Sequence, residues 1–213
     1  MQSEWLFVVK KLGVFLVCAA VMALLTSLLF IDINGFHNGE HESSLTEIAQ
    51  ELILLAIVVI HGLLLRNPAL RHSSALIGGF FLCMLIREMD FAFDLIRHGS
   101  WLWFALAVTL VALIYAGRAP QRTLAGLVGF FKHPSYGMLS AGLLTVLLFA
   151  RLMGMGTLWH TLLADDFIRT VKNAVEEGTE LFGYTLCLLA TLSYFHTQSG
   201  NDAHVAQPVA ADR

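Results

Sequence analysis

The sequence predicts an all-α fold, a polytopic membrane protein built as a bundle of six transmembrane helices. Of its 213 residues, 57% are hydrophobic and only 14% are charged, whereas soluble domains are about half apolar and a quarter charged. The apolar residues gather in runs close to the roughly twenty residues that a helix needs to cross a bilayer. The lipid bilayer is therefore the predicted environment of most of the chain.

Six apolar segments are candidate spans, separated by short polar stretches. The first segment follows Lys10 and Lys11 and is too long for the core of a cleaved signal peptide, so we predict that it is retained as a span. Pro68 and Pro120 fall in predicted short loops between spans. The predicted spans are residues 12–31, 48–65, 74–95, 101–117, 137–153 and 179–196.

Two segments fall outside these spans. Residues 123–131 are apolar but too short to cross a membrane, which predicts an interfacial or re-entrant piece. Residues 197–213 are polar and show no periodicity, which predicts a disordered tail. Residues 1–196 thus form one transmembrane domain.

The distribution of Lys and Arg predicts the orientation. With the N-terminus inside, eight basic residues face the cytoplasm and five face outward, and the C-terminus is also cytoplasmic. Thirteen of the sixteen acidic residues then lie on the outer side. The net charge of −3 and the lack of a basic stripe exclude nucleic acid as a partner.

Acidic residues open the second predicted span. Glu47 and Glu51 are one turn apart, and Glu51 lies about 5 Å inside the apolar run. Ionisable groups in a bilayer are costly and by default indicate function. The alternative for Glu47 is a first-turn acid that the helix dipole stabilises.

Charged residues also cluster at the end of the third predicted span. Glu88 points away from the others on a helical wheel and has no nearby cation, so it needs a partner from another helix, water or a proton. The pairs expected on the opposite face are Arg87 with Asp90, and Asp94 with Arg97 or His98.

A polar stripe runs into the sixth predicted span. Its members recur at steps of three and four residues, so their side chains share one helix face. Because the like charges repel in a low dielectric, we expect a cation, metal or proton beside them. The stripe comprises Asn173, Glu177, Glu180, Tyr184, Cys187 and Thr191.

Histidines raise the question of a metal ion. Imidazole and carboxylate together suit zinc, manganese or iron, but neither HExxH nor a di-iron ExxH motif occurs. A divalent metal ion therefore stays open as a cofactor. Its candidate ligands are Glu51, Glu88, Glu177, Glu180, His37 and His41.

Other features indicate helix packing. His61 is the one histidine well inside a predicted span, and we expect it to form a hydrogen bond between helices. Gly78 and Gly79 are small residues at which two helices can approach closely.

The order of three features resembles small bacterial inner-membrane proteins that have no assigned activity. These are the acidic first outer loop, Arg-Glu-Met-Asp-Phe at 87–91 and Glu-Glu-Gly-Thr-Glu-Leu-Phe-Gly-Tyr at 176–184. The resemblance implies the bacterial cytoplasmic membrane as the location and implies no reaction.

We therefore expect an outward-facing cavity of carboxylates and arginine that binds or translocates a cation, proton or metal. One alternative is a membrane enzyme that acts on a lipid or isoprenoid head group. Another is a structural subunit that associates with other membrane subunits or with copies of itself. The predicted site residues are Glu47, Glu51, Arg87, Glu88, Asp90, Glu177, Glu180 and Tyr184.

Overall fold

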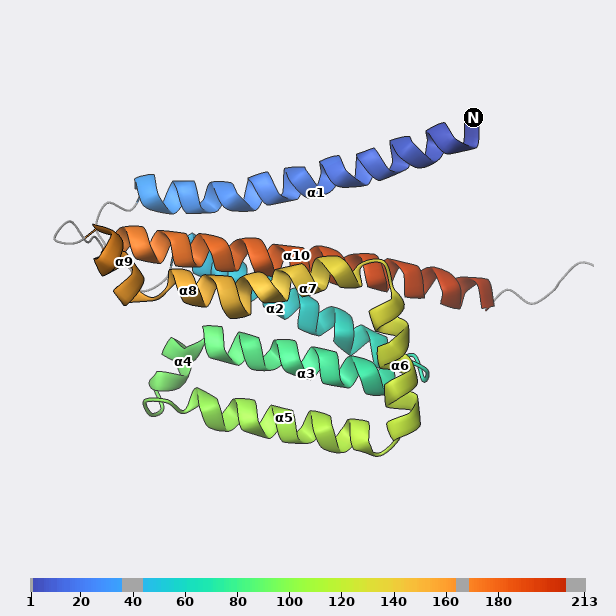
Figure 1. The fold of residues 1–213 in the computed structure, drawn as a ribbon. Coiled ribbons are helices and arrows are strands. Elements are labelled where there is room, and N and C mark those ends of the chain that lie inside the picture. Colours follow the sequence, from blue (N-terminus) through green and yellow to red (C-terminus); the bar gives the residue numbers. More distant parts are fainter. Residues whose placement is uncertain (1, 36–43, 164–168, 206–213) are drawn as a thin grey trace, which may run out of the picture. The chain divides into compact units, whose positions relative to one another are not determined.

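The computed structural model describes residues 2–35, 44–163 and 169–205, and every regular element among them is a helix (Figure 1). The predicted all-α fold is confirmed for these residues. The elements are α1 (Gln2–Gly35), α2 (Leu45–Leu64), α3 (Arg71–Glu88), α4 (Asp90–Asp94), α5 (Trp101–Gly117), α6 (Pro120–Lys132), α7 (Tyr136–Leu144), the π-helix η1 (Thr145–Ala150), α8 (Arg151–Met153), α9 (Gly156–Leu163) and α10 (Arg169–Val205).

The chain forms two compact units. Unit 1 comprises Met1–Gln50 and Gly142–Thr185, and unit 2 comprises Glu51–Ala141 and Leu186–Arg213. Within unit 2, α3 packs along α5, and α6 contacts both of these helices. Figure 1 shows α6 running across the end of this pair at which α5 finishes.

Four of the six predicted spans correspond closely to helical segments. The prediction for α5 has the correct bounds, 101–117. The segment 137–153 is made by α7, η1 and α8 in succession. The first two predicted spans fall on α1 and α2, although α1 is considerably longer than residues 12–31.

The third predicted span is wrong as a single helix. Helix α3 ends at Glu88, Met89 leaves the helical conformation (φ −87°, ψ 22°), and α4 begins at Asp90. Apolar residues continue to Leu95, so the hydrophobic pattern gives no sign that the helix is interrupted at Met89. Charged residues gather at this point, where the helix is interrupted at Met89 and resumes only for the five residues Asp90–Asp94.

The last helix is longer than the predicted span 179–196. Helix α10 continues to Val205, so residues 197–205 are helical where the sequence predicts disorder. Adding a residue to an existing helix is far easier than starting one, so a packed helix can extend into polar sequence. The rest of the predicted tail, residues 206–213, lies outside the described residues.

The short apolar segment 123–131 lies within α6. Pro120 occupies the start of this helix, where its missing N–H is harmless. Helix α6 is bent by 105° from α5. The Thr123 hydroxyl donates a hydrogen bond of 2.8 Å to the Ala116 carbonyl and so ties the two helices together.

Several helices are suited to a membrane. Among the described residues, three are long and apolar enough to cross one: Glu4–Asn34, Leu45–Leu64 and Tyr136–Met153. The bent pair α5 and α6 brings the number to four if it counts as one span, fewer than the six that the sequence predicts. Helix α3 falls short because its 18 residues include three charged ones, and the apolar part of α10 also carries tyrosines and threonines.

Candidate functional site: an acidic cluster in unit 1

A π-helix and a glycine bring two helices of unit 1 into close contact. A Cβ atom at Gly183 of α10 would lie 2.8 Å from the Gly142 carbonyl oxygen and 2.5 Å from Val146 Cγ2, so only glycine fits there. The segment Thr145–Ala150 is wound as a π-helix, a deformation that often occurs at functional sites. Arg151 follows it directly, beside the acidic part of α10.

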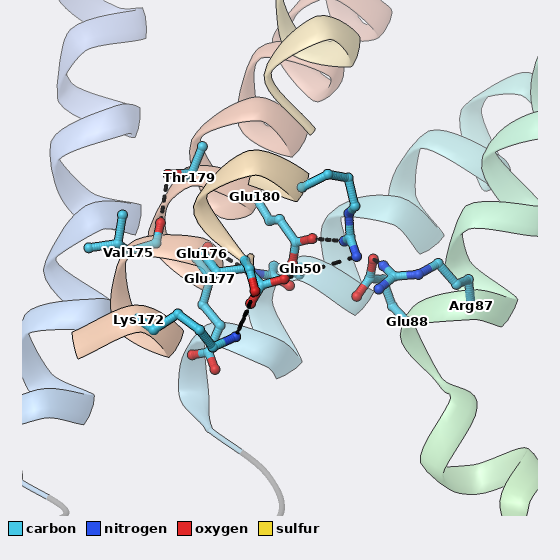
Figure 2. A network of polar contacts seen from close by, with 11 residues as sticks. Gln50, Arg87, Glu88, Lys172, Val175, Glu176, Glu177, Thr179 and Glu180 are labelled. Carbon is cyan, nitrogen blue, oxygen red and sulfur yellow. Dashed lines mark hydrogen bonds and ion pairs between the residues drawn. The ribbon is translucent and has the colours of Figure 1, made fainter. Parts of the chain in front are cut away.

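Arg151 and Lys172 neutralise two of the acidic side chains of α10. The Arg151 guanidinium donates a hydrogen bond to Glu180, whose side chain is only 7% exposed. Lys172 Nζ lies 2.8 Å from Glu176 Oε2 (Figure 2). The same ammonium group also donates a hydrogen bond to the Gly154 carbonyl. The cation that the polar stripe of α10 requires is therefore present.

The structure defines the surroundings of two predicted site residues of α10, Glu180 and Tyr184. Glu180 is paired with Arg151, and Tyr184, one turn further along the helix, is 1% exposed and buried in the protein. The pair between Glu180 and Arg151 joins residues 29 positions apart. Neither periodicity nor local spacing relates two such positions, so the sequence indicated the need for a cation without identifying it.

Glu177 differs from its two acidic neighbours. Its backbone carbonyl accepts a hydrogen bond of 2.9 Å from the Gln50 side chain, which holds α2 against α10 (Figure 2). Its half-buried carboxylate forms no ion pair with any residue in the described ranges. Glu177 precedes the apolar part of α10 and thus lies in the N-terminal polar part of the helix.

The electrostatic environment of Glu177 favours its neutral form. Burial is the main cause that raises the pKa of this carboxyl to about 7, and the negative charges of Glu47, Asp32 and Glu176 act in the same direction. Only the positive charge of Lys172 opposes them. Glu177 is therefore a carboxyl group that can exchange a proton near neutral pH.

Two further acids of unit 1, Asp32 and Glu47, cap the start of α2. Glu47 accepts a hydrogen bond from the Ser44 N–H, and the Ser44 hydroxyl accepts one from the Glu47 N–H, which is a capping box. Asp32 of α1 accepts hydrogen bonds from the Leu45 and Thr46 N–H groups, at 3.0 and 2.8 Å. Both carboxylates face the positive end of the helix dipole. Glu47 therefore has the structural role that was the alternative in the sequence.

In unit 2, the charged residues around the break after α3 pair locally. Arg87 Nη1 lies 2.5 Å from Glu88 Oε1 (Figure 2), which corrects the predicted pair of Arg87 with Asp90. The helical wheel fails here because α3 ends between these positions. The prediction that Glu88 has no nearby cation is also wrong, because the adjacent Arg87 supplies one. The predicted pair of Asp94 with His98 is confirmed at 2.7 Å, and the Gly99 N–H also donates a hydrogen bond to Asp94.

The remaining predicted site residues belong to unit 2. Glu51 is partly exposed and Asp90 is exposed, and both belong to unit 2 with Arg87 and Glu88. Their grouping with Glu180 of unit 1 thus stays a prediction.

The predicted metal ligands also find no common position. Within residues 2–35, 44–163 and 169–205, no three His, Cys, Asp or Glu side chains are arranged to hold an ion. His37 and His41 lie outside the described residues.

Comparison of the chain with protein-family models, curated proteins and solved structures finds no match. The inference of function therefore starts from the residues of the chain and their geometry.

Proposed function

We propose that this chain is an integral membrane protein that binds or carries a proton at Glu177, at the polar end of α10. One observation carries the proposal. Arg151 and Lys172 pair with Glu180 and Glu176, whereas Glu177 is half-buried among acids without an ion pair of its own in the described part of the chain. A carboxylate in that position gains more from a proton than a solvated one does.

A proton fits this geometry better than a metal ion. A metal ion needs several ligands around it, whereas one carboxylate is sufficient to hold a proton. The nearby acids keep the local potential negative, which attracts cations in general. Glu51 and Glu88 are further proton carriers in this proposal, and Arg87 adjusts the charge around Glu88.

The proposal includes the membrane arrangement that the sequence predicts. In it, six spans cross a bacterial cytoplasmic membrane and both termini are inside. The apolar helices α1, α2 and Tyr136–Met153 support a membrane location, and the excess of Lys and Arg on one side supports the orientation. Under that orientation Glu177 lies near the outer surface.

A structural role is the second candidate, and one observation favours it. Asp32 and Glu47 cap a helix, and Glu176 and Glu180 form ion pairs, so four of the acids that the structure describes in unit 1 have structural partners. In that case Glu177 would merely be a carboxyl that remains neutral.

Proton movement in proteoliposomes tests the proposed function. A potassium diffusion potential, negative inside, would drive protons inward, and a trapped pH-sensitive dye would report them. We expect the wild-type protein to acidify the lumen faster than empty vesicles and Glu177→Gln to abolish the difference. Glu4→Gln, at an exposed acid in the first turn of α1, is the control and should behave as wild type. Equal rates for wild type and Glu177→Gln would contradict proton transport through this residue.

A further inference from the structure

Unit 2 contains an apolar groove that the proposed function does not use. It lies between α2, α3 and α5 and has a volume of about 500 Å³, within the range of ~300–1,000 Å³ that is typical of small-molecule sites. Its walls include Ala75, Gly78, Gly79, Ala107 and Ala112. No charged residue lines it, so an ionic ligand would find no counter-charge there.

Small residues make the groove narrow at its base. A Cβ atom at Gly79 would lie 2.9 Å from Ala112 Cβ, and one at Gly78 would lie 2.9 Å from His61 Cβ. Helix α3 therefore approaches α2 and α5 closely at these glycines, as the sequence predicts.

His61 provides a polar group in this apolar surface. Its side chain lines the groove and is 0% exposed, and it stacks with Phe81 at a centroid distance of 6.4 Å. Neither ring nitrogen has a hydrogen-bond partner among the described residues. The predicted hydrogen bond between helices is thus wrong for this part of the chain. A buried imidazole without a partner loses free energy that a bound hydrogen-bonding group would recover.

Two hydroxyl groups lie along the same groove. Ser74 of α3 is 2% exposed, and Tyr115 of α5 stacks on His72 at 5.1 Å between ring centroids. Together with His61 they give an apolar slot a small number of hydrogen-bonding positions, the usual composition of a ligand site. A neutral, mainly apolar molecule that carries hydrogen-bonding oxygen atoms suits such a lining.

We propose that the groove between α2, α3 and α5 binds a lipid-soluble quinone or its quinol, with His61 hydrogen-bonded to a ring oxygen. The head group occupies the slot beside Gly78 and Gly79, and Ser74 and Tyr115 are available to the second ring oxygen. A fatty acid is disfavoured because no cation lines the groove. A hydrocarbon chain alone would leave the imidazole without a partner.

Calorimetric titration of the purified protein in detergent with decylubiquinone tests the proposal, with oleic acid as a second probe. We expect saturable binding of the quinone analogue and none of oleic acid. His61→Phe keeps an aromatic ring but removes both nitrogens, so we expect about fivefold weaker quinone binding. The melting temperature of this variant without ligand should be equal to or higher than that of wild type, because no hydrogen bond is lost.

A pair of variants on one helix makes the test independent of His61. Ala107→Phe fills the groove from an exposed position and should abolish binding, whereas Leu110→Phe, also exposed on α5 but outside the groove, should not change it. The proposal is overturned if wild type shows no saturable binding, if oleic acid binds as well as the quinone, or if Ala107→Phe binds normally. A lowered melting temperature of His61→Phe with unchanged affinity would assign His61 to structure instead.

Discussion

At the scale of single residues, the three neighbouring acids of α10 show how position decides the state of a carboxylate. Glu176 and Glu180 each form an ion pair, and Glu177 between them forms none with the described residues. All three are the same chemical group within two turns of one helix. Their different partners, not their identity, make one of them a candidate proton carrier.

Removing Arg151 should show how strongly Glu180 depends on it. The Glu180 side chain is almost fully buried, so Arg151→Met leaves a poorly solvated carboxylate and should lower stability by about 1–2 kcal/mol. The double variant Arg151→Met, Glu180→Gln should recover most of that loss, because the charge and its partner disappear together. Unfolding in a denaturing detergent measures both effects, and an unchanged stability of the single variant would contradict the pairing.

Glu177 should also make stability depend on pH. Its pKa in the folded protein is raised to about 7 from an ordinary value of 4.5. Between these values the folded state holds more protons than the unfolded state, so stability falls as pH rises through this window. Melting curves from pH 4 to pH 8 should therefore show a decline for wild type that is smaller for Glu177→Gln. A decline of the same size in both proteins would exclude Glu177 as its source.

At the scale of helices, the close contact between α10 and η1 positions the acidic cluster. The contact depends on Gly183, where even one methyl group would collide with Val146 and with the Gly142 carbonyl. The π-helical winding of residues 145–150 then brings the chain to Arg151 in reach of Glu180. The π-helical winding of this segment thus has a direct consequence for the pairing of Arg151 with Glu180.

Two glycine substitutions separate this contact from general helix effects. Gly183→Ala should lower stability by about 1–3 kcal/mol because the added methyl overpacks the contact. Gly137→Ala, with no atom within 4 Å of the new Cβ, should be neutral or slightly stabilising because alanine favours the helix. Thermal unfolding in detergent measures both variants, and equal effects of the two changes would argue against the contact.

At the scale of the whole molecule, the helical fold was predictable and its interruptions were not. Hydrophobic runs gave the all-α class and the bounds of α5, since they reflect local composition. They did not reveal the end of α3 at Glu88 or the extension of α10 to Val205, because apolar periodicity continues across the first and is absent from the second. The first reflects the backbone conformation at Met89, and the second reflects the ease of extending an existing helix.

The sequence indicated which acidic residues belong to the candidate site but not which residues they bind. The spacing of Glu177 and Glu180 predicted a polar stripe that needs a cation. The identity of Arg151 depends on a tertiary contact, and the capping of α2 by Asp32 joins Asp32 to Thr46, 14 positions further along the chain. Capping by Glu47 had a local signal, Ser44 three residues earlier, which sequence reasoning overlooked.

The membrane orientation leads to a prediction for reporter fusions. Because Lys and Arg favour the cytoplasmic side, alkaline phosphatase fused after Gly99 should be active and the same enzyme fused after Arg118 should be inactive. Green fluorescent protein fused after Arg213 should fluoresce, since that end is predicted to be cytoplasmic. The reverse pattern would show that the acidic residues face the cytoplasm.

The most direct test of the account is the titration of Glu177 itself. Carbon-13 NMR of protein with labelled glutamate side chains, compared with Glu177→Gln, would identify its carboxyl signal and follow it with pH. We expect a midpoint near 7, and a lower midpoint in Glu47→Gln, because that change removes a repelling charge while glutamine can still cap α2. A midpoint near 4.5, unaffected by Glu47→Gln, would contradict the assignment of Glu177 as the proton-binding group.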